Sequence, residues 1–198
     1  MSSIEYNNKE LNKIIIENTL KMLLKRNVID SVDLILAKFD NFNNQIYEFS
    51  VSENIHYNIN IINAKITSLS IGSPIDEYLS SNINVNKILI IKDFNKKVIK
   101  DITSIHKNVE LFFIKELQED IYEKIFQPDF ELLNEEHKNE ILQKFHSKEL
   151  STIFATDRMA RYFKAKPGDI FRITRSSVTA GHSIFYRQVG NSNWDILF

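Results

Sequence analysis

Apolar positions recur with helical spacing at the start of the chain and alternate with polar ones after it. Between residues 7 and 26 the apolar side chains follow a period close to that of a helix. Ser31 precedes a second apolar stretch, 32–36, with Asp33 in its first turn, which predicts a capped helix there. From 47 to 61, two stretches alternate apolar with polar residues. This alternation predicts two half-buried strands that pair antiparallel.

The middle of the chain changes to continuous apolar runs. Ser73 followed by Pro74 predicts the start of a short helix. The runs at 88–91 and 111–114 are typical of buried strands, and an amphipathic helical pattern over 98–105 separates them. The order strand, helix, strand predicts an α/β layer from about residue 45 to 126.

A second region begins near Pro128. Residues 134–146 have a helical pattern in which Ile141, Leu142 and Phe145 can form an apolar face. Asp157 can cap another short helix. Residues 170–175 and 183–189 alternate as strands, and their pairing would be antiparallel. Turns are predicted at 167–169 and 179–182.

The predicted fold class is α+β, with two domains. Residues 1–126 form an α/β domain in which helices flank a small central sheet. Residues 127–198 form a smaller α/β domain that contains a β-hairpin. With 198 residues and 43% apolar content, the chain is long enough to bury two small cores.

Composition narrows the possible functions. The chain has no cysteine, which excludes disulfides and thiolate metal sites, and its longest apolar runs are far shorter than the roughly 20 residues of a membrane span. We therefore expect an intracellular protein that does not bind a membrane. The net charge of -1 argues against free-standing nucleic-acid binding.

Charge is distributed unevenly along the chain. Residues 110–150 contain eleven acidic and five basic residues, whereas residues 158–187 contain seven basic residues and one acidic residue, Asp169. The basic stretch has two interpretations, a contact with an acidic protein surface or with phosphates, and an ordinary solvated face.

Catalytic motifs are weak. The few glycines do not form a phosphate-binding motif, and the five histidines lack the spacing of a helical zinc site. Glu135, Glu136 and Glu140 fit a solvated helix face better than a carboxylate pair. Ser176 and Ser177 lack a nucleophile elbow, so a hydrolase is disfavoured. We predict no catalytic residue, metal, cofactor or small-molecule substrate.

Arginines are the side chains most suited to a partner. Arg158 and Arg161 are three residues apart and can share a helix face, while Arg172 and Arg175 follow on the first hairpin strand. Guanidinium groups bind carboxylates and phosphates through two hydrogen bonds at once. The alternative is an ordinary hairpin surface.

An ordered set of short motifs points to a family. The motifs are Asp157 to Phe163, Lys166 to Asp169, Ile173 to Arg175, Thr179 to Gly181, and Tyr186 with Arg187. This run resembles, without a gap, the C-terminal assembly domain of the fifth common subunit of eukaryotic-type multisubunit RNA polymerases, which has a shorter archaeal counterpart. The strands at 88–91 and 111–114 resemble those that end the family's N-terminal jaw domain. Residues 1–80 match only in the order of elements.

The resemblance implies a non-catalytic assembly subunit of a DNA-directed RNA polymerase. It implies docking on the largest subunit through the C-terminal domain, with the jaw domain near downstream duplex DNA in the assembled complex. The implied location is the nucleus for a cellular protein, and host cytoplasm and virion for one from a large DNA virus. The partner-docking residues that follow are Arg158, Arg161, Arg172, Arg175, Thr179, Gly181, Tyr186 and Arg187.

The chain also departs from the family pattern. Phe130 stands where histidine is usual, and other departures fall at Ser151, Thr152, Arg158, Ser176, Val178 and His182. The partner surface is therefore expected to differ from the usual one. Residues after Val189 run past the usual end, and Trp194 among them either covers the domain or anchors a partner.

Two other function classes stay open from the residues alone. A degenerate magnesium nuclease would use Lys92 and Asp93 at the end of the strand 88–91, and activity lost on Asp93→Ala would support it. A free DNA-binding module would bind duplex with a steep dependence on salt.

Overall fold

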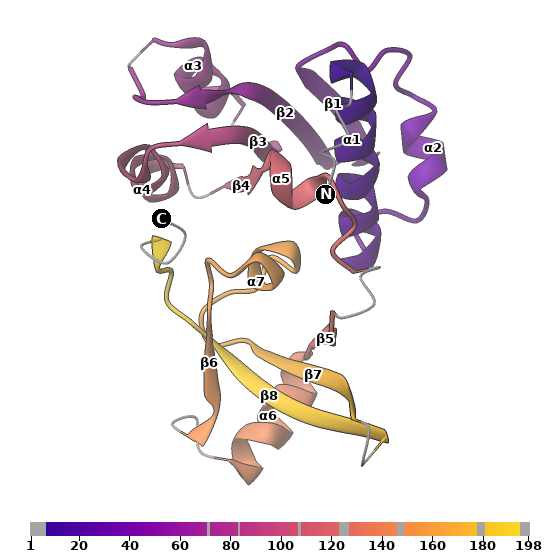
Figure 1. Cartoon of the computed structure of the whole chain (residues 1–198), viewed down its shortest axis with the longest axis vertical. Coiled ribbons are helices and arrows are strands. Elements are labelled where there is room, and N and C mark those ends of the chain that lie inside the picture. Colours follow the sequence, from indigo (N-terminus) through magenta and orange to yellow (C-terminus); the bar gives the residue numbers. More distant parts are fainter. Residues whose placement is uncertain are drawn as a thin grey trace. The chain divides into compact units, whose positions relative to one another are not determined.

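The computed structural model describes residues 7–70, 72–82, 84–106, 108–122, 127–145, 149–177 and 181–194. It divides into two compact units, Met1–Asp120 (unit 1) and Ile121–Phe198 (unit 2). In Figure 1 unit 1 runs from indigo to pink and unit 2 from salmon to yellow. Both mix helices with a sheet, so the predicted α+β class is confirmed.

Two helices open unit 1. In α1 (Asn8–Lys25), Asn7 and Glu10 form a capping box, and α2 (Val32–Leu36) begins where the Ser31 hydroxyl accepts a hydrogen bond from the Leu34 N–H. Both helices lie within the predicted ranges. One face of α1 is buried through Ile15, Ile16, Asn18, Thr19, Leu20, Met22 and Leu23.

The sheet of unit 1 has the order β1-β2-β3-β4. Its strands are β1 (Ile46–Ser52), β2 (Ile55–Ile66), β3 (Asn86–Phe94) and β4 (Val109–Phe113). The predicted antiparallel pairing of β1 with β2 is confirmed. Strands β2, β3 and β4 run parallel, because α3 (Pro74–Ser80) and α4 (Lys96–Ile105) carry the chain back between them. The short helix α5 (Ile114–Leu117) follows, so Ile114 is helical and not the last residue of a strand.

The sheet of unit 2 has the order β5-β7-β8-β6. The predicted hairpin is present as β7 (Ile170–Ser177) and β8 (Gly181–Gly190), paired antiparallel. Two short strands were not predicted, β5 (Asp129–Leu132) beside β7 and β6 (Ser151–Phe154) parallel to β8. Each has four residues, too few for alternation to be recognised.

The helices of unit 2 are α6 (Glu135–Lys144) and α7 (Arg158–Tyr162). Asp157 caps α7, as predicted, by accepting a hydrogen bond from the Met159 N–H at 2.8 Å. The prediction of an apolar face on 134–146 that included Phe145 was wrong. The helix ends at Lys144, Phe145 is extended and 43% exposed, and Ile141 is the buried residue of α6 among those described.

An aromatic cluster forms the core of unit 2. Phe171 is fully buried, and its ring meets those of Phe130 and Phe163 edge-on, each with centroids 5.6 Å apart. Tyr122 stacks on Tyr162 at 6.2 Å and donates a hydrogen bond to the Phe130 carbonyl at 3.0 Å. Tyr122 therefore packs with the elements of unit 2, although it precedes the boundary predicted between residues 126 and 127.

Candidate docking surface

The register of the β7–β8 hairpin divides the predicted docking residues between two faces. Arg172 lies opposite Tyr186, and Phe171 lies opposite Arg187. Because successive side chains of a strand point to opposite faces, Arg172 and Tyr186 share one face while Arg175 and Arg187 share the other. The predicted docking residues of the hairpin strands therefore lie on two faces of the sheet.

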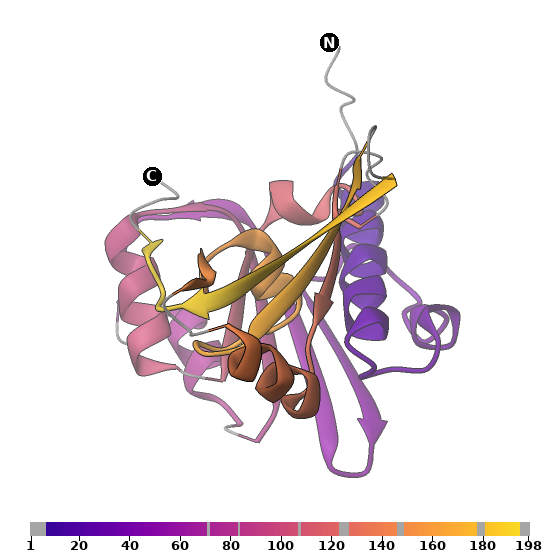
Figure 2. The ribbon, with the colours of Figure 1, turned by 90° about the horizontal axis from the view of Figure 1, so that it is seen from below.

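The outer part of the hairpin has fewer neighbours than the inner part. Strand β5 pairs with β7 over 171–174, and β6 pairs with β8 over 187–190. Residues 175–177 and 181–186 pair only with residues of the hairpin itself among the described strands. We call these residues the arm. Figures 1 and 2 show the outer end of the arm running past the ends of β5 and β6 as a two-stranded ribbon.

Two arginines of the hairpin are held by neighbours within the sheet. An Arg172 guanidinium nitrogen lies 3.3 Å from a Glu131 carboxylate oxygen, in an ion pair with both side chains well exposed. Exposed pairs of this kind contribute about 0–1 kcal/mol to stability, so Arg172 can exchange partners at little cost. The Arg175 guanidinium lies 5.4 Å from the centre of the Phe185 ring, a cation–π contact.

Arg161 takes part in a contact inside unit 2. Its Nε donates a hydrogen bond to the Thr156 carbonyl at 3.0 Å, and its guanidinium lies 5.8 Å from the centre of the Trp194 ring. The Thr156 hydroxyl in turn donates to the Asn193 carbonyl at 2.9 Å. The segment that runs past the family's usual end is thus fastened to α7. Of the two interpretations of Trp194, the structure fits the one in which it covers its own domain.

The remaining predicted docking residues have different surroundings. Arg158 is half-buried at the start of α7, and Thr179 lies outside the described residues. Gly181 begins β8 with a backbone angle φ of +72°, which residues other than glycine rarely adopt.

Gly190 is the glycine that sequence reasoning missed. A Cβ at Gly190 would lie 2.7 Å from Cγ2 of Thr152 on β6, whereas a Cβ at Gly181 would meet no atom within 4 Å. Gly181 is therefore restricted by its backbone angle, whereas Gly190 is restricted by the space around it. A glycine at the end of a predicted strand is the signal that points to such a close approach.

The departures from the family pattern fall into two groups. Phe130 is buried at 8% exposure against Phe171, so this change belongs to the core. Ser151, Thr152 and His182 are exposed on β6 and β8. Arg158 is half-buried, Ser176 is exposed, and Val178 lies outside the described residues. The exposed changes, in contrast to Phe130, alter the surface that unit 2 presents.

In unit 1, lysines gather where β3 ends and α4 begins. Lys92, Lys96, Lys97 and Lys100 are exposed there, and the first turn of α4 contains no acidic residue. Asp93 lies 3.0 Å from Lys65 in an exposed ion pair. We call these four lysines, together with Lys65, the lysine edge. The described residues contain no group of three or more His, Cys, Asp or Glu placed to hold a metal ion, such as the nuclease alternative would need around Asp93.

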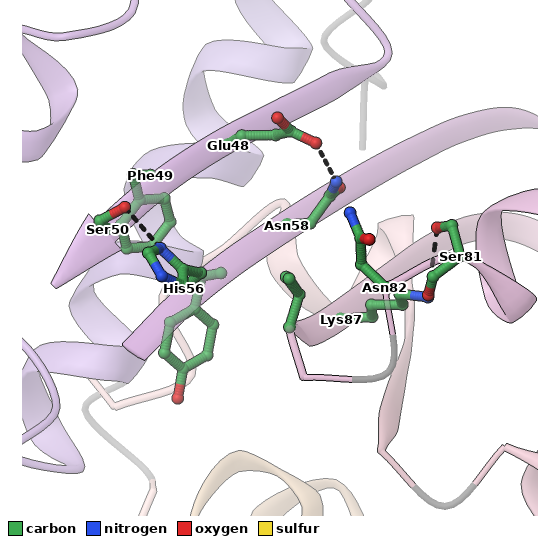
Figure 3. Close-up of a pocket in the computed structure, with 10 residues that line it drawn as sticks. Glu48, Phe49, Ser50, His56, Asn58, Ser81, Asn82 and Lys87 are labelled. Carbon is green, nitrogen blue, oxygen red and sulfur yellow. Dashed lines mark hydrogen bonds between the residues drawn. The ribbon is translucent and has the colours of Figure 1, made fainter. Parts of the chain in front are cut away.

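A polar pocket in unit 1 lies at the opposite end of the sheet from the lysine edge, where β2 and β3 begin (Figure 3). On its β1–β2 wall, the Ser50 hydroxyl and His56 Nδ1 are 2.7 Å apart, and the Asn58 amide donates to Glu48.

Lys87 forms the opposite wall and is 3% exposed. Its ammonium donates to the carbonyls of Tyr78 at 2.7 Å and Leu79 at 2.9 Å, and to that of Ser81. These carbonyls lie at the end of α3, so Lys87 caps that helix from within the sheet. Burial lowers the pKa of Lys87 and raises the pKa of Tyr78. With three hydrogens and three carbonyl partners, Lys87 has a structural role in this pocket.

Comparison with known proteins agrees with this architecture. Residues 119–189 match the family model described as RNA polymerase Rpb5, C-terminal domain. Over 193 residues the chain is 30% identical to DNA-directed RNA polymerase subunit 5 of Acanthamoeba polyphaga mimivirus, covering 92% of this chain and 93% of that protein.

Two shorter matches come from cellular organisms. DNA-directed RNA polymerase subunit Rpo5 of Thermofilum pendens is 43% identical over 72 residues, which are 35% of this chain and 90% of the archaeal protein. DNA-directed RNA polymerase V subunit 5C of Arabidopsis thaliana is 29% identical over 113 residues, covering 55% of this chain and 48% of the plant protein.

These matches define a class, the small subunits of multisubunit DNA-directed RNA polymerases. The chain belongs to the family of RNA polymerase subunit 5, called Rpb5 or Rpo5, and works in transcription with other polymerase subunits as partners. The resemblance expected from the motifs between Asp157 and Arg187 is confirmed. No helix in the described ranges is both long and apolar enough to cross a membrane.

Proposed function

We propose that the chain is a non-catalytic assembly subunit that docks on the largest subunit of its RNA polymerase through unit 2. The observation that carries the proposal is the arm together with the two arginines that border it. Arg175 lies in the arm with the half-exposed Ile184 and Phe185, while Arg172 and Arg187 stand next to it in the sheet. Interfaces are enriched in arginine and aromatic residues of this kind. The docking residues proposed are Arg172, Arg175, Tyr186 and Arg187 of the hairpin strands, together with Thr179 and Gly181.

Arg158 and Arg161 support this surface from α7 in the proposal. Arg161 already binds the Thr156 carbonyl and lies over Trp194, so it acts by holding the domain together. We accordingly propose a positioning role for Arg161 and a direct role for the hairpin arginines.

Unit 1 is proposed as a jaw-like domain that lies beside downstream DNA in the assembled polymerase. The lysine edge supports this proposal, because clustered lysines lower the cost of approaching phosphates. With a net charge of -1 for the whole chain, this contact is proposed for the complex and not for the free protein.

The proposed location follows from the polymerase that the subunit serves. For a cellular enzyme it is the nucleus. For an enzyme of a large DNA virus, the source favoured by the whole-length viral relative, it is the host cytoplasm and the virion.

Co-purification tests the docking proposal. The tagged full chain, expressed in its natural host, is expected to bring down the two largest polymerase subunits in equal amounts. Recovery of the chain without the largest subunit would contradict the proposal, even if other polymerase subunits were present.

A further inference from the structure

Strand β8 has one edge that is only partly covered. On one side, β7 pairs with β8 over 181–188. On the opposite side, β6 pairs with β8 over 187–190 only. Along 181–186 that second edge has no strand partner among the described residues, and this stretch has the length of an ordinary strand.

Hydrogen bonds at the end of β8 show which backbone groups face each side. The Val189 N–H donates to the Asp169 carbonyl, and the Val189 carbonyl accepts from the Gly168 N–H, both at 2.8 Å. Val189 therefore directs both groups towards the residues that lead into β7. The Gly190 carbonyl accepts from the Ala155 N–H at 3.2 Å, on the side of β6.

These directions alternate from residue to residue along an antiparallel strand. His182, Ile184 and Tyr186 therefore direct their N–H and C=O groups to the side where no described strand lies. We call these backbone groups the open edge. His182 and Ile184 are exposed and Tyr186 is partly exposed, so another chain can reach them.

The open edge lacks the features that usually keep exposed edge strands from pairing, which are lysine, other charges, proline and bulges. In unit 1, by contrast, the edge strand β1 has the exposed Glu48 and a register shift between Ser50 and Ser52. Residues 182–186 pair with β7 in regular register, and Ile, Phe and Tyr at 184–186 favour strands. This stretch is thus suited to pairing with a further strand.

Charge around the open edge favours an acidic partner. Residues 170–190 contain Arg172, Arg175 and Arg187 and no acidic residue. The Glu131 carboxylate offsets Arg172 alone, in their exposed ion pair. Two copies paired edge to edge would bring like charges together, whereas an acidic strand would be attracted.

We infer that a strand of the largest polymerase subunit adds to the sheet of unit 2 along the open edge, beside β8 and in line with β6. Hydrogen bonds between the two main chains supply the affinity, and acidic side chains on the added strand, near Arg187, supply the selectivity. This inference rests on the proposed docking through unit 2 and specifies its geometry.

Amide hydrogen exchange, resolved to single residues, tests the inference in the full chain. In the free chain the amides of the open edge are expected to exchange fast, and that of Phe185, which bonds to β7, slowly. Reconstitution into polymerase depleted of this subunit is expected to slow the open-edge amides at least about tenfold. The Ser176 amide faces the opposite edge of the hairpin, beyond β5, and is expected to stay fast.

Proline tests the same backbone groups by affinity for the depleted polymerase. Ile184→Pro removes one N–H of the open edge and places a ring in the path of the added strand, at a position where an edge strand tolerates proline. Ile184→Thr removes the apolar side chain but keeps the N–H, and Ser176→Pro is the matched control at the opposite edge. Ile184→Pro is expected to bind at least about tenfold more weakly than Ile184→Thr, and Ser176→Pro within about twofold of the parent chain.

Cross-linking identifies the partner. The chain has no cysteine, so His182→Cys provides a single site for a photo-activated cross-linker. We expect a cross-link to the largest subunit in the reconstituted polymerase. A cross-link to another subunit instead, or between two copies of this chain, overturns the inference.

The remaining outcomes separate the inference from the proposed function. Open-edge amides that stay fast in the reconstituted polymerase overturn the inference, and docking then uses other residues of unit 2. Equal affinities of folded Ile184→Pro and Ile184→Thr, with folding verified by circular dichroism, have the same meaning. Failure of the parent chain to enter the depleted polymerase contradicts the proposed function itself.

Discussion

The two units differ in how far they bury apolar side chains in their strands, as residues 88–91 and residues 184–185 show. In β3 of unit 1 these residues are fully buried, since the strand is central and has a parallel neighbour on each side. In β8 of unit 2 they are almost half exposed, because at this point β8 has β7 on one side and no described strand on the other. Unit 1 therefore covers its central strand completely, and its exposed apolar strand residues, Ile46 and Ile55, stand alone at the ends of β1 and β2. Unit 2 exposes two consecutive apolar residues within a strand, which fits the docking proposed for it.

The same contrast holds for charge. In the described part of unit 1 the buried lysine is Lys87, which caps α3, and exposed lysines gather at one edge. In unit 2, arginines lie beside aromatic rings, as Arg175 does with Phe185 and Arg161 with Trp194. Lysines spread over an edge suit phosphates, and arginines paired with aromatic groups suit a protein surface.

The largest expected effect tests whether the two cores are independent. Phe171→Ala removes a fully buried ring from unit 2, and Phe112→Ala removes one that is 1% exposed from unit 1. Each is expected to cost its own unit about 3–5 kcal/mol of unfolding free energy and to leave the other unit unchanged. Hydrogen exchange followed by mass spectrometry reads the two units separately in the full chain. Equal loss of protection in both units would show a single cooperative domain and break the comparison.

An intermediate effect depends on pH and concerns unit 1. The Tyr78 hydroxyl donates to the Asn58 carbonyl at 3.0 Å, and burial raises the pKa of Tyr78 above its usual 10.0. Above pH 10 the native state keeps this proton while the unfolded state loses it. Because the native state then holds one more proton than the unfolded state, the free energy of unfolding decreases as the pH rises. The contribution of Tyr78 to stability is therefore complete below pH 10 and falls above it.

Tyr78→Phe measures this contribution. Near neutral pH the variant is expected to be about 1 kcal/mol less stable than the parent chain, because one hydrogen bond is removed. Above pH 10 the difference should shrink by up to about 1.4 kcal/mol per pH unit. Denaturant unfolding at a series of pH values gives both numbers, and a difference that does not change with pH would contradict the buried hydroxyl.

An effect of comparable size separates support from docking in unit 2. Arg161→Met removes the hydrogen bond to Thr156 and the charge over Trp194, at an expected cost of about 1–2 kcal/mol. Trp194 is the single tryptophan of the chain, so its fluorescence reports the contact directly. We expect easier quenching of that fluorescence by acrylamide and unchanged capture of the largest subunit. Abolished capture with unchanged fluorescence would make Arg161 a docking residue after all.

The smallest effect on stability, within about 0.5 kcal/mol, is expected at the lysine edge. Lys96→Gln combined with Lys97→Gln should instead reduce the salt dependence of downstream DNA binding in the assembled polymerase, by about 0.9 in slope for each phosphate that is no longer neutralised. Lys13→Gln with Lys38→Gln, both exposed elsewhere in unit 1, is the matched control. An equal salt dependence for the two double variants would contradict a contact between the lysine edge and DNA.

Sequence reasoning recovered the elements whose local signals are strong. Capping at Ser31 and Asp157 and the alternation of the hairpin strands all appear in the structure as predicted. The strands β5 and β6 escaped prediction because four residues carry little periodicity and their pairing is decided by distant strands.

The candidate site was harder to predict than the elements. The motifs identified the arginines, but the division of Arg172 and Arg175 between two faces depends on the hairpin register. The inward direction of Arg161 depends on a distant segment that returns to α7, since Asn193 and Thr156 are 37 residues apart. Neither relation has a local signature in the sequence.

The central claim is that unit 2 carries docking and unit 1 does not. It is tested by capture of the largest polymerase subunit with fragments 1–120 and 119–198, the second of which keeps Tyr122 with its partners Tyr162 and Phe163. Circular dichroism first verifies that both fragments are folded. The account predicts that fragment 119–198 captures the subunit about as well as the full chain does and that fragment 1–120 captures none. Capture by a folded fragment 1–120, with none by a folded fragment 119–198, would contradict it.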